Sequence, residues 1–110
     1  MKKEQRMKRI YVAGKYSSSN TIEFLNNIHD GIRASANILK QGHACFCPWL
    51  DYQFQFFDKT LAVEDYQRYS MAWLEVSDEI YVLPNSENSK GTQVEIKRAT
   101  ELGIPVTYVL

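Results

Sequence analysis

The sequence has no long apolar run and no excess of charge of either sign. No stretch of its 110 residues reaches the eighteen or more apolar positions that a membrane-spanning helix needs. Thirteen basic and thirteen acidic residues cancel, so no net field draws the protein to nucleic acid or to an anionic membrane. We therefore expect neither a membrane nor a nucleic acid among its partners.

Cysteine is scarce, and its placement excludes the usual metal and redox motifs. Cys45 and Cys47 are the two cysteines, and no matching pair of cysteines or histidines accompanies them. In a strand they would point to the same face, as reduced core residues. The basic start of the chain is not followed by the apolar run of a signal peptide. These features predict a cytoplasmic protein without metal.

The basic residues are unevenly placed, because five of the thirteen lie in the first nine positions. We interpret residues 1–8 as a basic tail that either keeps the protein soluble or serves as a weak anion-binding arm. Residues 9–110 are then one domain, since a chain of this length is too short for two ordinary cores.

Short β-branched and aromatic runs alternate with segments of helical periodicity. Strands are predicted at residues 9–14, 43–49, 79–83 and 105–110, and helices at residues 21–42, 61–76 and 92–103. The aromatic residues 51–59 stay unassigned. Alternating strands and helices predict parallel strands with right-handed crossovers. The expected fold is an α/β, flavodoxin- or Rossmann-like three-layer sandwich, whose sheet has four strands, or five, in the order 2-1-3-4.

The apolar positions also predict which helix faces are buried. In the first helix they recur at spacings of three and four, after Asn20 and Glu23, which resemble a capping box, and before Gly42 as the stop. The second helix should bury Tyr66, Trp73 and Leu74. The predicted buried face of the first helix comprises Ile22, Leu25, Ile28, Ile32, Ala36 and Leu39.

Two loops should border one crevice, since ligands of open parallel sheets bind outside the carboxyl ends of the strands where strand order reverses. The loop at residues 84–91 opens a helix with Ser89, Gly91 and Thr92, a hydroxyl- and glycine-containing N-terminus that suits an anion. The loop at residues 14–20 either cradles a phosphate or sugar or is a solvated serine loop. Neither contains a G-x-G-x-x-G or P-loop motif, which excludes those dinucleotide and nucleotide sites, and no cofactor is expected.

Glu95 lies about one turn into the third predicted helix. It faces the crevice if Val94 and Ala99 pack on the sheet, and it either complements the helix dipole or takes part in catalysis. A second carboxylate could come from Asp51, Glu64 or Asp65. The aromatic residues 52–57 could stack a base, pack over the sheet edge or form a subunit interface.

Three segments together resemble a known family: IYVAG at residues 10–14, MAWLEVSD at residues 71–78, and SKGTQVE at residues 89–95 followed by Ala99. In order and spacing they resemble the nucleoside 2-deoxyribosyltransferase superfamily, in particular its short bacterial and phage-type members near the deoxynucleoside monophosphate N-glycosidases. The resemblance implies cleavage or transfer at an N-glycosidic bond, with Glu95 as the nucleophile. It also implies a homo-oligomer.

Two serines refine what the resemblance implies. Ser89 stands six residues before Glu95, where relatives that hydrolyse nucleoside monophosphates have serine and those that exchange free nucleosides have an acid. A nucleotide is therefore favoured over a nucleoside. Ser70 stands where the family usually has an aspartate that helps the leaving base, so the alternative is a non-catalytic nucleotide-binding protein, a sensor or sequestering protein. Around the nucleophile, the expected substrate and phosphate contacts are Gly14, Tyr16, Ser17, Asp51, Ser89, Gly91 and Thr92.

Overall fold

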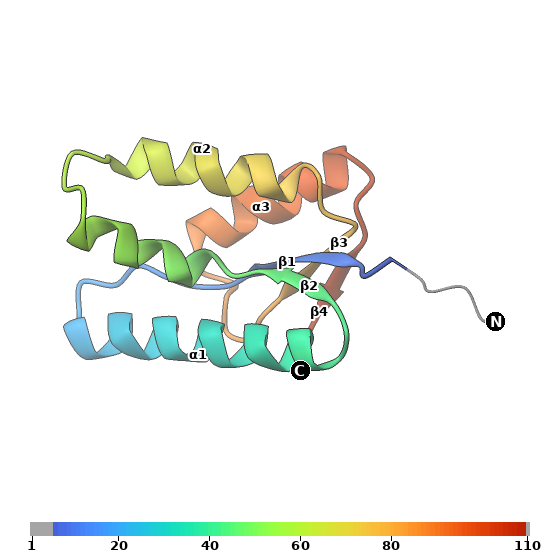
Figure 1. Ribbon diagram of the computed structural model, residues 1–110, viewed down its shortest axis with the longest axis horizontal. Helices are drawn as coiled ribbons and strands as arrows, with labels where there is room; N and C mark the ends of the chain where they lie inside the picture. Colours follow the sequence, from blue (N-terminus) through green and yellow to red (C-terminus); the bar gives the residue numbers. More distant parts are fainter. Residues whose placement is uncertain (1–5, 110) are drawn as a thin grey trace.

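The computed structural model describes residues 6–109, which form a four-stranded parallel sheet flanked by helices (Figure 1). Every strand pair is parallel and the strand order is β2-β1-β3-β4, so the predicted α/β architecture and order are confirmed. The elements, in chain order, are β1 (Arg9–Ala13), α1 (Thr21–Lys40), β2 (Ala44–Phe46), the 3-10 helix η1 (Pro48–Phe56), α2 (Val63–Leu74), β3 (Glu79–Val82), α3 (Lys90–Glu101) and β4 (Val106–Tyr108).

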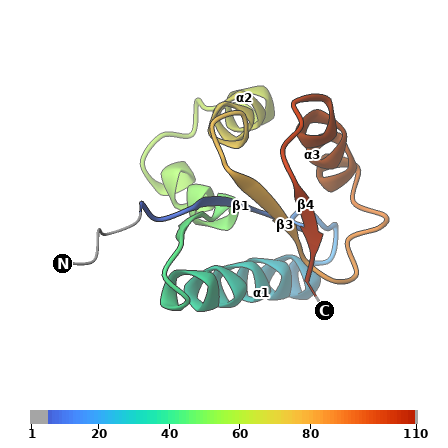
Figure 2. The same cartoon turned by 90° about the vertical axis from the view of Figure 1, so that its right-hand side faces the viewer.

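The helices form a layer on each side of the sheet. Helix α1 covers one face, and α2 and α3 cover the other (Figure 2). Because successive strand residues point to opposite faces, Ile10 and Val12 of β1 pack toward α1, whereas Tyr11 and Ala13 pack toward α2 and α3. All four are buried, so β1 is the centre of both halves of the core.

The helix ends follow their local sequence. Asn20 caps α1 by accepting a hydrogen bond from the backbone N–H of Glu23 at 2.9 Å, and Ser89 caps α3 in the same way. After α1 and α3 the chain turns at Gly42 and Gly103, whose φ angles of 97° and 73° lie in the left-handed region that favours glycine. The two capping residues and the two glycines therefore set where α1 and α3 begin and end.

The segment after β2 differs most from prediction. Residues 43–49 were expected to be a strand, but β2 ends at Phe46 and Pro48 begins η1. Proline suits the first position of a helix because its φ is fixed and it has no N–H to satisfy. The unassigned aromatic residues mostly belong to this 3-10 helix, which lies beyond the end of β2, between the α1 and α2 layers (Figure 1).

The buried face of α1 is rotated from the predicted one. Ile28 is buried and Ile32 packs against the core, as expected, but Ile22, Leu25 and Leu39 are 71%, 42% and 56% exposed. The face that meets the sheet comprises Asn27, Ile28, Gly31, Ser35 and Ile38. It has the same spacing of three and four, but Asn27, Gly31 and Ser35 are polar or small, so apolar periodicity pointed to the neighbouring face.

The remaining corrections are smaller. Helix α2 is shorter than predicted, and of its expected buried residues Leu74 is fully buried while Trp73 is 48% exposed. Helix α3 begins two residues earlier than predicted, at Lys90. The last strand ends at Tyr108, and Leu110 lies outside the described residues. No helix within residues 6–109 is long and apolar enough to cross a bilayer.

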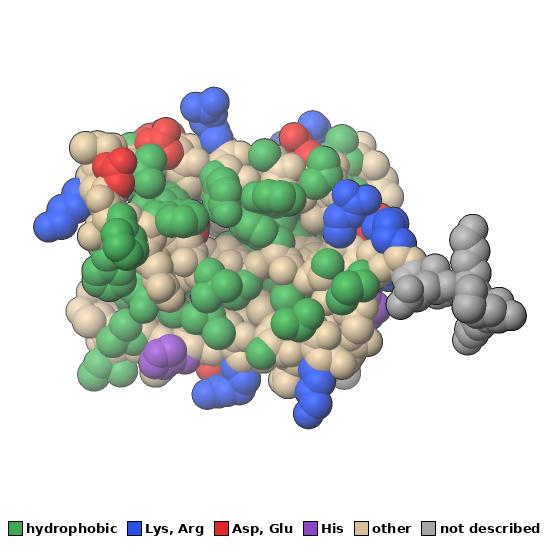
Figure 3. Space-filling view, viewed as in Figure 1, with side chains coloured by type: hydrophobic (Ala, Val, Ile, Leu, Met, Phe, Trp, Pro, Cys, Tyr) green, Lys and Arg blue, Asp and Glu red, His purple; other side chains and the backbone are tan. Residues whose placement is uncertain are grey.

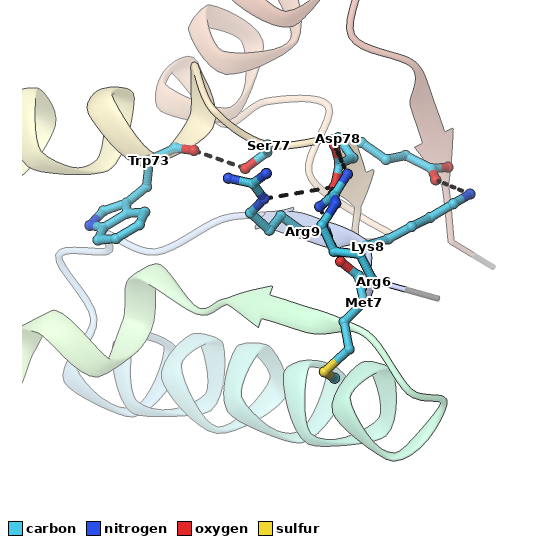
Figure 4. Close-up of polar contacts among 8 residues, drawn as sticks. Arg6, Met7, Lys8, Arg9, Trp73, Ser77 and Asp78 are labelled. Carbon is cyan, nitrogen blue, oxygen red and sulfur yellow. Dashed lines mark hydrogen bonds and ion pairs between the residues drawn. The ribbon is translucent and has the colours of Figure 1, made fainter. Parts of the chain in front are cut away.

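The described part of the basic tail is anchored to the protein. Arg6 donates two hydrogen bonds to Asp78, at 2.9 and 3.1 Å, and the backbone N–H of Arg9 donates a third to the same carboxylate at 2.7 Å (Figure 4). Lys8 lies 3.7 Å from Glu79. These contacts are at the amino ends of β1 and β3, the opposite end of the sheet from the predicted crevice. Residues 1–5 of the predicted tail lie outside the described part of the chain.

The two cysteines lie on one side of the sheet, as predicted. Cys45 and Cys47 are both free and both pack in the cluster beneath α1. The Cys45 thiol donates to the backbone oxygen of Ser35 at 3.2 Å. Burial raises the pKa of both thiols, which disfavours the reactive thiolate. They are structural residues in this protein.

Candidate functional site

Glu95 lies on the inner face of α3, in the first turns of that helix. Helix α3 begins near the carboxyl ends of the strands. Thr92 and Ala99 are buried at 1% and 0% exposure, and Glu95 stands between them at helical spacings of three and four. Ala99 packs on the sheet as expected. Val94 does not, because it is 56% exposed, and Ile96 packs against the core instead. The helix therefore turns the carboxylate of Glu95 inward.

The Tyr11 hydroxyl donates a hydrogen bond to Oε2 of Glu95. Tyr11 comes from the central strand, and its ring is held by stacking on Phe46 with centroids 5.4 Å apart. Burial raises the pKa of Glu95 to about 7, against the opposing effect of the Tyr11 hydrogen bond. Burial and the charge of Glu95 raise the pKa of Tyr11 well above its usual value, so the phenol stays a donor.

Ser70 joins this pair from α2. A hydrogen-bonding interaction with Ser70 lowers the pKa of Tyr11, against the larger effects of burial and of Glu95. Three elements, β1, α2 and α3, thus bring one carboxylate and two hydroxyls together. Sequence patterns missed the role of Tyr11. The available signal was a tyrosine in a fully buried strand, whose hydroxyl needs a partner.

A second carboxylate–phenol pair lies where the loop after β1 meets η1. The Tyr16 hydroxyl donates to Oδ1 of Asp51 at 2.6 Å, and Asp51 is only 8% exposed. Burial raises the pKa of Asp51, while the Tyr16 hydrogen bond opposes this effect. The charge of Asp51 also contributes to raising the pKa of Tyr11, after burial and Glu95. The two carboxylates therefore act on a common neighbour.

The N-terminus of α3 is organised chiefly by its own residues. Ser89 Oγ accepts from the backbone N–H of Thr92 at 3.3 Å and from the Thr92 hydroxyl at 2.9 Å. Thr92 is buried, so both its donors serve the cap. The N–H groups of Lys90 and Gly91 precede the first intrahelical acceptor and remain outside the helix ladder. A Cβ at Gly91 would meet nothing within 4 Å, which leaves open space at this turn.

The three predicted substrate contacts in the loop after β1 have different surroundings. A Cβ at Gly14 would lie 3.1 Å from the Trp49 ring and 3.2 Å from Leu83, so tight packing explains this glycine. Tyr16 is turned to Asp51, and Ser17 is exposed. A groove of about 640 Å³ is lined by α1 and by parts of both predicted loops, Lys15 and residues 84–86, but Glu95 does not line it.

The other acids predicted as a second carboxylate, Asp65 and Glu64, lie on the first turn of α2. Asp65, one of the candidates for a second carboxylate, accepts from the backbone N–H of Ala62 at 2.8 Å and so caps α2. Glu64 is exposed on the same helix turn. Among the residues described, no group of three or more histidine, cysteine, aspartate or glutamate side chains is placed to hold a metal ion.

A family model described as a domain of unknown function, DUF4406, matches residues 8–108. The chain belongs to this family. A search of curated proteins gives no match. Both carboxylate–phenol pairs and the N-terminus of α3 lie inside the matched range, so the DUF4406 domain of this protein contains the whole candidate site.

Proposed function

We propose that this DUF4406 protein cleaves or transfers the N-glycosidic bond of a deoxynucleotide, with Glu95 as the nucleophile. The observation that supports this most is the inward carboxylate of Glu95, held by the Tyr11 hydroxyl close to a helix N-terminus. A displacement at an anomeric carbon needs a carboxylate fixed in one orientation in a partly dry site. The resemblance to the 2-deoxyribosyltransferases independently assigns the nucleophile to the same residue.

A nucleotide is the favoured substrate because of the turn that opens α3. The exposed N–H groups of the first helical turn and the positive end of the helix dipole favour a phosphate. Ser89 adds no negative charge there, and Gly91 adds no side chain. Ser89 and Thr92 contribute by shaping the cap, and Gly91 and Lys90 would face the phosphate.

The proposed reaction has two steps, in which Glu95 first binds the sugar covalently and is then released. Glu95 attacks C1′ of the sugar, the C1′–N bond breaks, and its electron pair leaves with the base, which takes up a proton. Water, or the nitrogen of a second base, then attacks C1′ and releases the Glu95 carboxylate. The sum with water is free base and deoxyribose 5-phosphate.

The test is base release from a panel of 2′-deoxynucleoside 5′-monophosphates and nucleosides, followed by chromatography. We expect Glu95→Gln to lower the rate by at least about a thousandfold, because the attacking oxygen is lost. Glu101→Gln, an exposed change on the same helix, should keep the wild-type rate. The proposal fails if the wild-type protein releases no base from the panel, or if Glu95→Gln matches it.

The second candidate is a protein that binds a nucleotide without cutting it. Ser70 favours it, since a hydroxyl beside Tyr11 cannot supply the proton that an aspartate would. Calorimetric binding of a nucleotide that chromatography recovers intact after long incubation would select this candidate over the enzyme.

A further inference from the structure

A serine at position 70 leaves the leaving base without an evident proton donor. Protonating the base contributes on the order of 10²–10⁴ in rate, so a hydrolytic site needs an acid in reach of it. Asp65 caps α2 by accepting a hydrogen bond from the backbone N–H of Ala62 at 2.8 Å, and Glu64 is exposed. Of the four acids that follow β2 or open α2 (Asp51, Asp58, Glu64 and Asp65), only Asp51 is buried.

Asp51 is held in place from both sides. Trp49, two residues before it, is 1% exposed and donates through Nε1 to the backbone oxygen of Lys15 at 3.1 Å. Tyr16, the next residue of that loop, donates to Asp51 at 2.6 Å. Two hydrogen bonds thus join η1 to the loop after β1. The carboxyl group is positioned by a rigid aromatic anchor, as an acid that meets one atom of a substrate must be.

The Tyr66 hydroxyl of α2 has no hydrogen-bond partner among residues 6–109. Within the described part of the chain it is a fully buried oxygen without a hydrogen bond. Burial, and after it the charge of Asp51, raise the pKa of Tyr66, and the charge of Tyr66 contributes to the raised pKa of Tyr16. The orphaned hydroxyl therefore belongs to the surroundings of Asp51. A buried donor without a partner is costly and points to an acceptor that arrives with a ligand.

We propose, resting on the function above, that Asp51 is the acid that protonates the leaving base, held by Tyr16, with Tyr66 donating a hydrogen bond to the same base. The ligand chemistry is that of a nucleobase, whose ring nitrogens and carbonyl oxygens accept both hydrogens. As the C1′–N bond breaks, the proton passes from the Asp51 carboxyl group to the base, and the carboxylate remains. When water attacks the sugar on Glu95, its proton goes to solvent, and the Asp51 carboxylate takes up a proton from solvent before the next turnover.

The experiment compares two substrates that differ in their need for an acid. One is 2′-deoxyguanosine 5′-monophosphate. The other is its N7-methyl derivative, whose base is already cationic and departs without protonation. For Asp51→Asn we expect a loss of about 10²–10⁴ in base release from the first substrate and less than about tenfold from the second. Glu64→Gln is the matched control and should change neither rate.

The outcomes separate this inference from the function on which it rests. If Asp51→Asn loses the same factor on both substrates, or loses nothing on either, the role of Asp51 is overturned. The proposed function still stands in that case, provided that Glu95→Gln is inactive on both substrates. If the wild-type protein releases base from neither of these substrates, the role given to Asp51 is overturned; if it releases base from no member of the panel, the proposed function is overturned as well.

Tyr66→Phe keeps the inference falsifiable even if Asp51→Asn fails to fold. Removing an unsatisfied buried hydroxyl should leave the fold intact and raise the melting temperature. Base release should nevertheless fall by about tenfold, the loss expected for one hydrogen bond to a substrate. A variant that is more stable and less active fits a ligand contact. Unchanged activity would overturn the role given to Tyr66.

Discussion

The ring of Trp49 occupies the space that a side chain at Gly31 would need. A Cβ atom at residue 31 would lie 2.0 Å from Cδ2 of the indole, which is far inside van der Waals contact. Trp49 in turn stacks against Tyr16, with ring centroids 6.4 Å apart. A glycine in the middle of α1 therefore allows η1, and with it Asp51, to pack against the loop after β1.

Gly31→Ala is expected to destabilise the fold even though alanine is the better helix former. The gain of about 1 kcal/mol in helix propensity is outweighed by the clash with Trp49, because overpacking a buried site costs about 1–3 kcal/mol or more. Thermal or urea unfolding measures the change. Gly91→Ala, also in a helix but facing open space, is the control and should be neutral or slightly stabilising. Equal effects of the two substitutions would contradict the packing argument.

The stability of the protein should fall as the pH rises through the titration of Glu95. The pKa of Glu95 is raised from 4.5 to about 7 by burial, so the folded state holds a proton that the unfolded state has lost. The contribution is complete below pH 4.5 and is lost by about pH 7 and above, and it amounts to roughly 3 kcal/mol or less.

Urea unfolding of the wild-type protein and of Glu95→Gln between pH 4.5 and 8 tests this. Glutamine does not titrate, so the difference in unfolding free energy between the two proteins should change across this window. A constant difference would show that the pKa of Glu95 is close to its ordinary value.

Tyr11→Phe should shift the ionisation of Glu95 upward. The hydroxyl of Tyr11 stabilises the Glu95 carboxylate and opposes the effect of burial, so its removal raises the pKa of Glu95 further. The ascending limb of kcat/KM, which follows the ionised nucleophile, should move to higher pH. Carbon-13 NMR titration of the Glu95 carboxyl group gives the same shift without any turnover. If neither the ascending limb of kcat/KM nor the NMR titration of Glu95 shifts in Tyr11→Phe, the Tyr11 hydroxyl does not influence the pKa of Glu95.

The exposed aromatic side chains near β2 suit an interface between copies of the chain, which the resemblance also implies. Phe54, Tyr69 and Trp73 are 45%, 40% and 48% exposed, and apolar side chains gather on this face (Figure 3). We expect light scattering to give an oligomeric mass for the wild-type protein and a smaller one for Trp73→Glu. Val94→Glu, which charges an exposed position on α3, should leave the mass unchanged. A monomeric wild-type protein would contradict the expectation.

Much of the fold follows from local patterns in the sequence. The alternation of β-branched runs with helical periodicity determined a parallel sheet, since a parallel connection needs a crossover segment. Asn20, Gly42 and Gly103 marked three of the ends of α1 and α3, because capping and left-handed turns depend on single residues, whereas the Ser89 cap begins α3 two residues before its predicted start. The sequence placed Glu95 toward the crevice only if Val94 and Ala99 packed on the sheet; Ala99 does, but Val94 is exposed.

The tertiary structure alone decided how these elements meet. The apolar spacing of α1 marks a face that includes Leu25, but the face that meets the sheet includes Gly31 instead, where the Trp49 ring packs. The pairing of Tyr16 with Asp51 joins residues 35 positions apart, and that of Tyr11 with Glu95 joins residues 84 apart. Such pairs depend on packing between layers, which local periodicity does not encode. The sequence by itself determined the parallel sheet, its strand order and the turns after α1 and α3, whereas the extent of β2, the helix η1 and the two carboxylate sites depended on packing in the folded protein.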